Sequence, residues 1–485
     1  MATAQGQPWA LHPDRALPAE PGVRALAREI YAQTAPLPIV AMHGHVAAAD
    51  IRNNAGFGDP TELLIIPDHY LIRMLVSQGY SHEELGVVPQ DSARAVGPVE
   101  TDHRLIWRRF AENWKLFRGT PTRYWLEHEL GEIFGVTAEL SATTADAIYD
   151  QLTEQLARPE FHIQPLFDTF KIEILSTTDA PDASLEDHEA LARAGWGERV
   201  VPTFRPDALF YPHTHSWRAH VDSLGERSGV DTSDYDGYLA ALKQRRSAFI
   251  AAGARASDHG HLSANTEPLD LAQARWLFRD AQVAPLSAAD SDAFAAHMLF
   301  ESARMALDDG LVMQLHTGVV RNHSPHMLDS YGTDVGFDIP RTAEFTEGLR
   351  PLLSAFGHEP GFRLILFTVD ESTYSRELAP IAGAYPSVKL GAPWWFLDSP
   401  HGMARFRRLT TETAGFYNTS GFVDDTRAFA SIPARHDLAR RVDAGYLAGL
   451  VAEYRLPLEE AIETAVDLAY RLPRESYARR DGGAQ

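Results

Sequence analysis

Two histidines near the start of the sequence have a spacing that would let them share a metal ion. His43 and His45 follow the apolar run from Ile39 to Met42 and are separated only by Gly44. Successive side chains of a strand point to opposite faces, so residues i and i+2 leave the strand on the same side. The pair is therefore a candidate ligand set, although two histidines at this spacing also occur without a metal.

The composition limits what such a site can contain. The chain has 485 residues and no cysteine, which excludes disulfides, thiolate metal sites and cysteine nucleophiles. A metal would have to be held by histidines and carboxylates. The formal net charge of −22 argues against nucleic acid or an anionic membrane surface as a partner. An anionic substrate would therefore need arginines close to it.

Strand-like and helix-like segments alternate along most of the chain. After the strand that ends at His43, residues 51–165 are almost free of strand signals and predict a helical insertion. Further strands are expected at 170–179, 199–207, 254–260, 311–318, 362–370, 388–396 and 414–425, with helical segments between most of them. Eight strands that alternate with helices predict a (β/α)₈ barrel. A doubly wound sheet is the alternative, but no glycine-rich dinucleotide fingerprint follows the first strand.

This pattern divides the chain into four parts. We expect an N-terminal helical segment at 1–36, the first barrel strand at 37–50, the insertion lobe at 51–165, and the remaining barrel with its C-terminal helices at 166–485. No apolar run approaches the roughly 18 residues of a membrane span, and the N-terminus lacks the pattern of a signal peptide. We therefore expect a cytoplasmic protein without membrane partners.

Polar side chains collect where the expected strands end, which is where barrel enzymes carry their active sites. Each has an ordinary explanation when taken alone, such as a helix cap for Asp179 or a core position for His316 and for one tryptophan. Together they suit a metal site that binds an anionic, oxygen-rich small molecule. The candidates are His43, His45, Thr177, Thr178, Asp179, Arg205, Asp207, Asp258, His259, His316, Arg321, Asn322, Trp394, Trp395, Asp424, Asp425 and Arg427.

Closure of the barrel would bring the last strand beside the first, and so Asp425 beside the two histidines. Two histidines and one aspartate leave coordination positions open for water or substrate oxygen. Zn²⁺ is the first expectation, with Mn²⁺, Fe²⁺ and Co²⁺ as alternatives. His316 is either a further ligand or a hydrogen-bond donor to the substrate. The candidates to clamp a carboxylate are Arg205, Arg321 and Arg427, since the guanidinium fork matches it bidentately.

Several separated motifs occur in a fixed order between residues 38 and 441. They are MHGHV, DHYLIRM, STTDAPDASLEDH, PTFRPD, RASDHG, MQLHTGVVRN, YGTDVGFD, GAPWWF and FVDDTRAFASIPARHDLARR. In this order they resemble the uronate isomerase family, also called glucuronate isomerase, of the amidohydrolase superfamily. The most specific of them are MQLHTGVVRN and the double tryptophan.

The resemblance implies a distorted (β/α)₈ barrel with a helical insertion after the first strand. It implies an aldose–ketose isomerase that interconverts D-glucuronate with D-fructuronate, and D-galacturonate with D-tagaturonate. For this reaction we expect proton transfer through an enediol, with Asp425, Tyr70 and His316 as the catalytic candidates. The resemblance implies His43, His45 and Asp425 as metal ligands. The expected substrate contacts, besides Tyr70 and His316, are Arg205, Arg321, Arg427, Asp258, His259 and Trp394.

The chain also departs from the family pattern. Met42 and Gly44 stand where the family usually has an aromatic and a bulkier residue, Asp424 and Thr426 stand where Thr and Ser are more usual, and HSPHM follows Asn322. These positions flank the site, so they bear on substrate preference more than on reaction class. The alternatives are a metal-dependent hydrolase of the same superfamily, an isomerase of a related sugar or sugar acid, and a catalytically idle binding protein. We expect a small-molecule sugar acid as the partner, and a homo-oligomer because barrels of this size usually associate.

Overall fold

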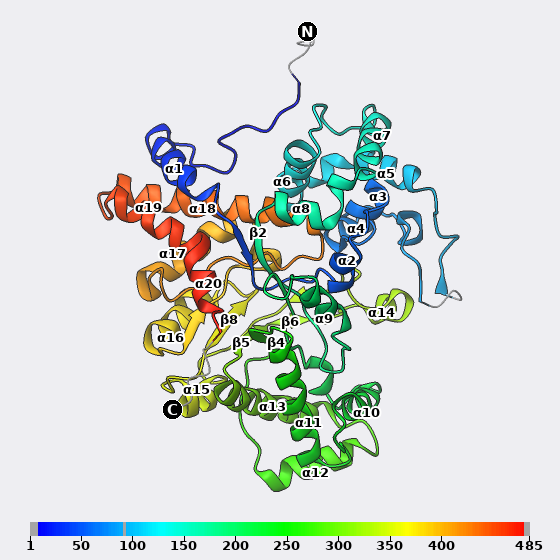
Figure 1. Cartoon of the computed structure of the whole chain (residues 1–485), viewed down its shortest axis with the longest axis vertical. Coiled ribbons are helices and arrows are strands. Elements are labelled where there is room, and N and C mark those ends of the chain that lie inside the picture. The colour runs from blue at the N-terminus through cyan, green and yellow to red at the C-terminus, as the bar shows by residue number, and fades with distance from the viewer. Residues whose placement is uncertain (1–7, 91–93, 480–485) are drawn as a thin grey trace.

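The computed structural model describes residues 8–90 and 94–479, and its parallel strands lie between helices (Figure 1). One sheet has the order β1-β2-β3, with β1 at Ile39–Ala41, β2 at Ile172–Ser176 and β3 at Val200–Val201. The other has the order β4-β5-β8-β9. Its strands are β4 (Ala256–His259), β5 (Val312–Thr317), β8 (Leu364–Thr368) and β9 (Val388–Leu390). A short antiparallel hairpin, β6 (Val319–Val320) with β7 (Ile339–Pro340), lies outside both sheets.

Single bridges join the two sheets into a closed ring. Phe204, just after β3, pairs with Ser257 of β4, and Leu390 of β9 pairs with Thr419. The segment that begins at Thr419 then reaches the residues just after β1, where the Asp425 N–H donates to the carbonyl of His43 at 3.2 Å. Three strands of one sheet, four of the other and this last segment make eight parallel elements around a barrel. The predicted (β/α)₈ fold is therefore confirmed, and the doubly wound sheet is excluded.

Several of the expected strands are much shorter than the sequence pattern indicated. The strand expected at 199–207 is reduced to Val200–Val201, and the one expected at 414–425 forms only the bridge at Thr419. Pro202 follows β3 directly and has no N–H to donate to a ladder. Gly421 has φ +80°, a conformation that interrupts an extended strand. The barrel is distorted for these reasons.

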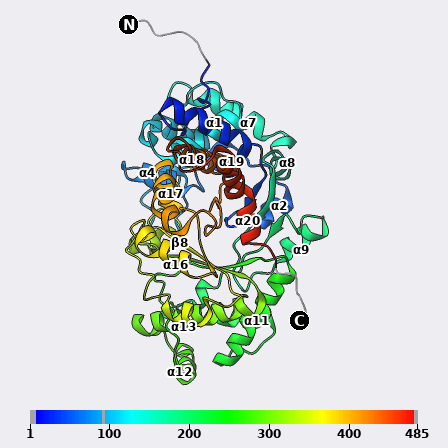
Figure 2. The same cartoon turned by 90° about the vertical axis from the view of Figure 1, so that its left-hand side faces the viewer.

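The helices that connect the strands form the outside of the barrel. Figure 2 shows α11, α12 and α13 at one end of the molecule and α1, α18 and α19 near the other. Apolar residues of α1, α18 and α19, such as Ile30, Leu447 and Ala465, share one buried cluster. The connecting and terminal helices are α1 (Pro21–Thr34), α9 (Glu186–Arg193), α10 (Trp217–Ser228), α11 (Tyr235–Ala251), α12 (Leu271–Ala281), α13 (Ala288–Asp309), α14 (Pro325–Tyr331), α15 (Arg350–Phe356), α16 (Ala379–Ala384), α17 (Pro400–Ala414), α18 (Ile432–Ala452), α19 (Leu458–Val466) and α20 (Leu472–Ser476).

A group of helices between β1 and β2 has a hydrophobic core of its own, which includes Leu71, Trp107 and Leu152. Aspartates begin several of these helices; Asp68, for example, accepts the backbone N–H groups of Tyr70 and Leu71. We call these helices the lobe. They are α3 (Pro60–Leu64), α4 (His69–Val76), α5 (His103–Glu112), α6 (Pro121–His128) and α7 (Ala145–Leu156), whereas α2 (Ala48–Asn53) and α8 (Ile163–Thr169), at the two ends of the insertion, pack on the barrel strands. In Figure 1 most of the lobe lies on one side of the barrel, close to the end of β1.

Branched and aromatic side chains fill the inside of the barrel. Val40, Ile174, Val312 and Ile365 come from different strands and belong to one buried cluster, together with Phe367. This is the packed interior expected of such a barrel rather than a pore. None of the described helices is both long and apolar enough to cross a membrane.

Gly391, directly after β9, allows the close approach that this packing requires. A Cβ atom at Gly391 would lie 2.3 Å from Cδ1 and Cε1 of Phe367, whose ring stacks on His316 with 4.1 Å between centroids. We predict that Gly391→Ala lowers the free energy of unfolding by about 1–3 kcal/mol, since the phenyl ring must move. Thermal unfolding followed by circular dichroism measures this.

Gly449→Ala is the matched control for this substitution. Gly449 lies within α18, and a Cβ atom there would meet nothing within 4 Å. The alanine should leave the unfolding midpoint unchanged or raise it slightly, because alanine is the better helix former. Equal midpoints for the two variants would contradict the packing described for Gly391.

Candidate active site

A cavity of 1170 Å³ opens at the carboxyl ends of the barrel strands. Its wall brings together residues that are far apart in sequence, including His43, Arg205, His316 and Asp425 from the barrel and Tyr70 from the lobe. His45, Arg321, Arg427 and Trp394 line it as well. The strand ends that the sequence singled out therefore meet at one place.

Two of the predicted substrate contacts are not on the wall of this cavity. Asp258 and His259 have no exposed surface, and neither lines the cavity. His259 lies 3.1 Å from the Ser257 hydroxyl through Nε2, and its ring stacks against Phe210. The predicted contact of His259 with substrate is therefore not retained. Asp258 influences the cavity through its contacts with Arg205 and His316.

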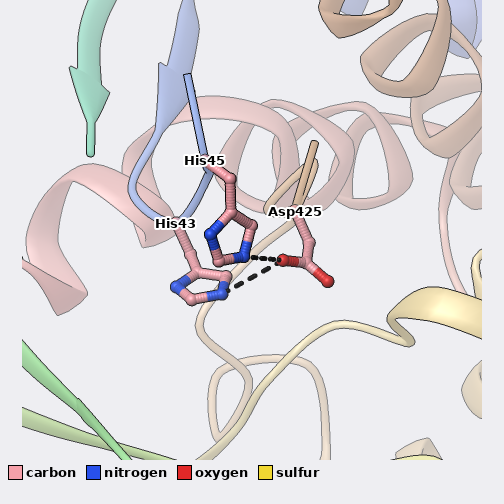
Figure 3. A group of neighbouring side chains, drawn as sticks. All are labelled: His43, His45 and Asp425. Carbon is pink, nitrogen blue, oxygen red and sulfur yellow. Dashed lines mark hydrogen bonds and ion pairs between the residues drawn. The ribbon is translucent and has the colours of Figure 1, made fainter. Parts of the chain in front are cut away.

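His43 and His45 leave β1 on the same side, as their spacing predicted, and both turn toward Asp425 (Figure 3). Nε2 of His43 lies 3.2 Å and Nε2 of His45 lies 3.0 Å from the same oxygen, Oδ1 of Asp425. The aspartate reaches them because the last barrel segment pairs with β1. Its backbone has φ +45°, a left-handed conformation that non-glycine residues seldom adopt and that is often found at functional sites.

The donor atoms of these three residues fit a divalent metal. They lie within 4.8 Å of one another and consist of two imidazole nitrogens and a carboxylate oxygen. Zn²⁺ and related ions prefer such ligands. Burial lowers the pKa of His45, which favours the neutral imidazole that metal binding requires. Burial also opposes ionisation of Asp425, but hydrogen bonds from both histidines hold its pKa well below the usual value.

Asp258 lies behind the cavity wall and orients His316. Its Oδ1 is 2.6 Å from Nδ1 of His316. Although burial disfavours its charge, His316 and Arg205 hold the pKa of Asp258 well below the usual value, so this carboxylate is ionised and can only accept. His316 must then donate from Nδ1. This leaves Nε2 as a lone-pair acceptor, and the structure gives Nε2 no hydrogen-bond partner.

The ring of His316 is fixed in position on three sides. It stacks on His43 with 4.5 Å between centroids and on Phe367 at 4.1 Å, and the Trp394 ring meets it edge-on at 4.7 Å. Burial lowers the pKa of His316, so the imidazole is neutral near pH 7. The arrangement is that of an oriented base held by a carboxylate.

Arg205 supplies a positive charge with a fixed orientation. Its Nε donates to Oδ2 of Asp207 at 2.8 Å, and its Nη1 lies 3.1 Å from Oδ2 of Asp258. Burial opposes the charge of the guanidinium, but Asp207 and Asp258 raise its pKa, so it stays protonated.

Two further arginines on the wall are held more loosely. Nη1 of Arg321 donates to Asp338 at 3.1 Å, and the guanidinium lies 4.7 Å over the Trp395 ring. Nη2 of Arg427 lies 3.4 Å from Asp334, with both side chains more than a third exposed. The sequence singled out both arginines but not their aspartate partners. These belong to YGTDVGFD, where the motif shows their presence but not which arginine each one meets.

The lobe closes the cavity on the side of α4. Tyr70 lies in the first turn of this helix, and its ring stacks on His69 with 4.6 Å between centroids. His69 in turn meets Trp395 edge-on at 6.1 Å. Burial raises the pKa of Tyr70 well above its usual value, so the hydroxyl carries its proton at neutral pH. Tyr70 therefore offers a neutral hydroxyl that can donate a hydrogen bond at this wall.

Comparison with known proteins gives one consistent family. The family model described as glucuronate isomerase matches residues 23–477. A uronate isomerase of Phenylobacterium zucineum is 51% identical over 97% of this chain and 97% of its own length. A uronate isomerase of Rhizobium meliloti is 51% identical over 96% of this chain and 99% of its own.

Solved structures agree with these relatives. The crystal structure of a glucuronate isomerase from Caulobacter crescentus is 48% identical, covers 99% of both chains and superposes with a TM-score of 0.94. A uronate isomerase from Thermotoga maritima is 30% identical, covers 96% of this chain and 99% of its own, and has a TM-score of 0.89. Similarity at this level extends over the barrel and the lobe together.

Removal of the Arg205 guanidinium should destabilise the fold, because the buried Asp258 loses one of its two partners. We predict that Arg205→Met lowers the free energy of unfolding by about 2–3 kcal/mol. The same substitution should cost clearly less when Asp258 is already Asn. Chemical denaturation of the two single variants and the double variant measures this coupling.

Arg218→Met is the control for loss of an arginine. Arg218 forms an i,i+4 pair with Asp222 at the surface, and both side chains are about half exposed. Its loss should change stability by less than about 1 kcal/mol. If Arg205→Met were as stable as this control, Asp258 would not depend on Arg205.

Proposed function

The chain belongs to the glucuronate isomerase family and is an aldose–ketose isomerase, and we propose that it acts on open-chain hexuronates with a divalent metal held by His43, His45 and Asp425. The substrate pairs are D-glucuronate with D-fructuronate and D-galacturonate with D-tagaturonate. One observation carries the proposal: the two-histidine, one-aspartate group shares a cavity with several arginines, among them Arg205, Arg321 and Arg427. A hexuronate offers oxygens at carbons 1 and 2 to the metal and a carboxylate at carbon 6 to the arginines.

The metal would polarise an oxygen of the substrate as a Lewis acid. His43, His45 and Asp425 offer one ligand atom each, which leaves room for substrate oxygens in the coordination sphere. Zn²⁺ is the first candidate, and Mn²⁺, Fe²⁺ and Co²⁺ suit the same donor atoms.

Arg321 and Arg427 would bind the carboxylate of the substrate. Each is paired with an aspartate through a single contact and is exposed to the cavity. Such guanidiniums can turn part of their fork toward a second carboxylate. Arg205 is held by two aspartates, so it contributes a fixed charge. Fixed charges serve best where negative charge develops during the reaction, here at the enediol oxygens.

His316 and Tyr70 would carry the protons. In the direction from aldose to ketose, Nε2 of His316 takes the proton from carbon 2, and the Tyr70 hydroxyl protonates the oxygen on carbon 1. The enediol that results then receives the proton from His316 at carbon 1, while Tyr70 recovers its proton from the oxygen on carbon 2. Atoms and charges balance, and both residues end as they began. The free Nε2 of His316 and the protonated Tyr70 support this division.

The hydrolase that the sequence left open has no support of its own. It would use the same cavity to split a bond with water, yet the relatives at about half identity are isomerases. The arginines of the cavity suit the binding of an acidic substrate, and they do not in themselves favour hydrolysis. An idle sugar-binding protein is excluded because the chain is an enzyme of this family.

Metal removal should abolish the reaction. We predict that a chelator followed by dialysis lowers ketose formation from D-glucuronate or D-galacturonate by at least about 100-fold, because a Lewis acid contributes several kcal/mol to such a step. Addition of Zn²⁺ or Mn²⁺ should restore it. D-glucose, which lacks the carboxylate, is the control substrate and should give no ketose. Unchanged turnover after the metal content has fallen to background would contradict the metal's role.

Proton exchange with solvent tests the assignment of His316. When the reaction is run in D₂O, the aldose recovered from the mixture should carry deuterium at carbon 2, which NMR detects. His316→Asn should lose both turnover and exchange, because an amide cannot take up the proton. Turnover in D₂O without deuterium at carbon 2 would favour a shielded proton transfer or a hydride transfer, and full turnover by His316→Asn would contradict the role of His316 as the base.

A further inference from the structure

Arg435 is a cavity residue to which none of the steps above assigns a role. It lies in the first turn of α18, is 3% exposed and lines the cavity. A buried arginine on the wall of an active site needs an explanation, because burial of a charge is costly unless the charge is paired.

On one side, Arg435 contacts the lobe. Its guanidinium lies 3.7 Å over the ring of Trp125 in α6 and 5.7 Å over the ring of Tyr70 in α4. Trp125 itself meets Tyr70 edge-on, with 5.8 Å between centroids. The two aromatic rings and the guanidinium therefore pack as one unit, and a cation over an aromatic face is attracted to it. Tyr70 is held by this unit and by its stacking on His69.

On the other side, Arg435 contacts the barrel. Its Nη1 donates to Oδ2 of Asp398 at 2.7 Å and to the backbone carbonyl of Asp424 at 3.3 Å. Its Nε donates to the hydroxyl of Ser431 at 3.2 Å. Asp424 directly precedes Asp425, so this single side chain bonds to the backbone next to a proposed metal ligand. Asp398 follows the double tryptophan after β9.

Arg435 also offsets a group of buried acids. Burial raises the pKa of Asp398 to about 7 and that of Glu129 to about 8, and it raises the pKa of Asp68; in all three the charge of Arg435 acts in the opposite direction. Asp68 is the residue that caps α4 next to Tyr70. The guanidinium thus stabilises the charges that surround the helix on which Tyr70 lies.

We propose that Arg435 is a positioning residue for the isomerisation. It fixes the position of the Tyr70 hydroxyl relative to Asp425, because it joins the lobe to the last segment of the barrel. The proposal rests on the proton transfer assigned above to Tyr70. Arg435 acts through Tyr70 and is anchored to the barrel by the Asp424 backbone, so loss of its bridge would shift Tyr70 relative to the barrel wall of the cavity.

Arg441 provides a matched control on the same helix. It is 7% exposed, its guanidinium lies 4.2 Å over the ring of Tyr31, and its Nε donates to Asp437 at 2.8 Å. It therefore makes the same kinds of contact as Arg435 but does not line the cavity. A purely structural role would give the two arginines the same phenotype.

The experiment measures kcat and KM for ketose formation by the metal-loaded protein and five variants. Arg435→Met should lower kcat by about 100-fold, the effect of a misplacement of about 1 Å, and change KM by less than about 3-fold. Arg435→Lys keeps the charge but not the fork, so it should recover about 10-fold of the loss. Arg441→Met should keep kcat within about 2-fold of the parent.

Tyr70→Phe and the double variant with Arg435→Met complete the cycle. If Arg435 acts through Tyr70, its replacement should cost less than about 3-fold in kcat once the hydroxyl is gone. If Arg435→Met does not fold, Arg435→Lys takes its place in the cycle. Its smaller loss of kcat should again occur only in the protein that retains Tyr70.

The outcomes distinguish the positioning role of Arg435 from the proton transfer assigned to Tyr70. Equal kcat for the Arg435 and Arg441 variants would overturn the positioning role alone, as would an undiminished loss in the Tyr70→Phe protein. Full activity of Tyr70→Phe would instead overturn the proton transfer assigned to Tyr70, and the positioning role with it. A loss at Arg435 that depends on Tyr70, with Arg441→Met active, is the result that the structure supports.

Discussion

Closure of the barrel between its last segment and its first strand is the constraint on which the site depends. Two backbone hydrogen bonds make this seam, from the Asp425 N–H to the carbonyl of His43 and from the His45 N–H to the carbonyl of Thr426. They bring side chains together that are 380 residues apart in the chain. Because the same backbone groups also fix the direction of the side chains, the donor atoms are oriented by the fold itself. Such preorganisation is what a metal site with few protein ligands requires.

Pairs of opposite charges around the cavity hold further side chains in fixed orientations. Asp258 has no exposed surface and is kept ionised by His316 and Arg205, while Arg435 and Asp398 form a second buried pair. Buried pairs of this kind add little net stability, since the desolvation of both partners offsets their attraction. Their value here is orientation: each presents a side chain or a backbone group to the cavity at a fixed angle. The more exposed Arg321 and Arg427 are free to adapt to a substrate.

The sequence predicted the parts of this structure that depend on local pattern. Periodicity located the eight strands, the spacing of His43 and His45 predicted their common direction, and the order of the motifs identified the family. It could not predict how far each strand pairs, because Pro202 and Gly421 interrupt the regular strands, whose partners lie elsewhere in the chain. His259 looked equivalent to its neighbours at strand ends, yet it faces the helix side of the wall beside Phe210. Arg435 lies in a quoted motif, but its bridge to Trp125 and Tyr70 exists only after the lobe has packed on the barrel.

The metal content of the purified protein shows whether His43, His45 and Asp425 form a metal site. Equilibrium dialysis against Zn²⁺, followed by elemental analysis, gives the number of tightly bound ions per chain for the parent and for Asp425→Ala, with replacement of Asp437, a partly buried aspartate outside the cavity, by alanine as the control. A site made by His43, His45 and Asp425 predicts about one ion for the parent and the Asp437 variant, and a loss of affinity of at least about 10–100-fold for Asp425→Ala. Undiminished zinc binding by Asp425→Ala would contradict the account.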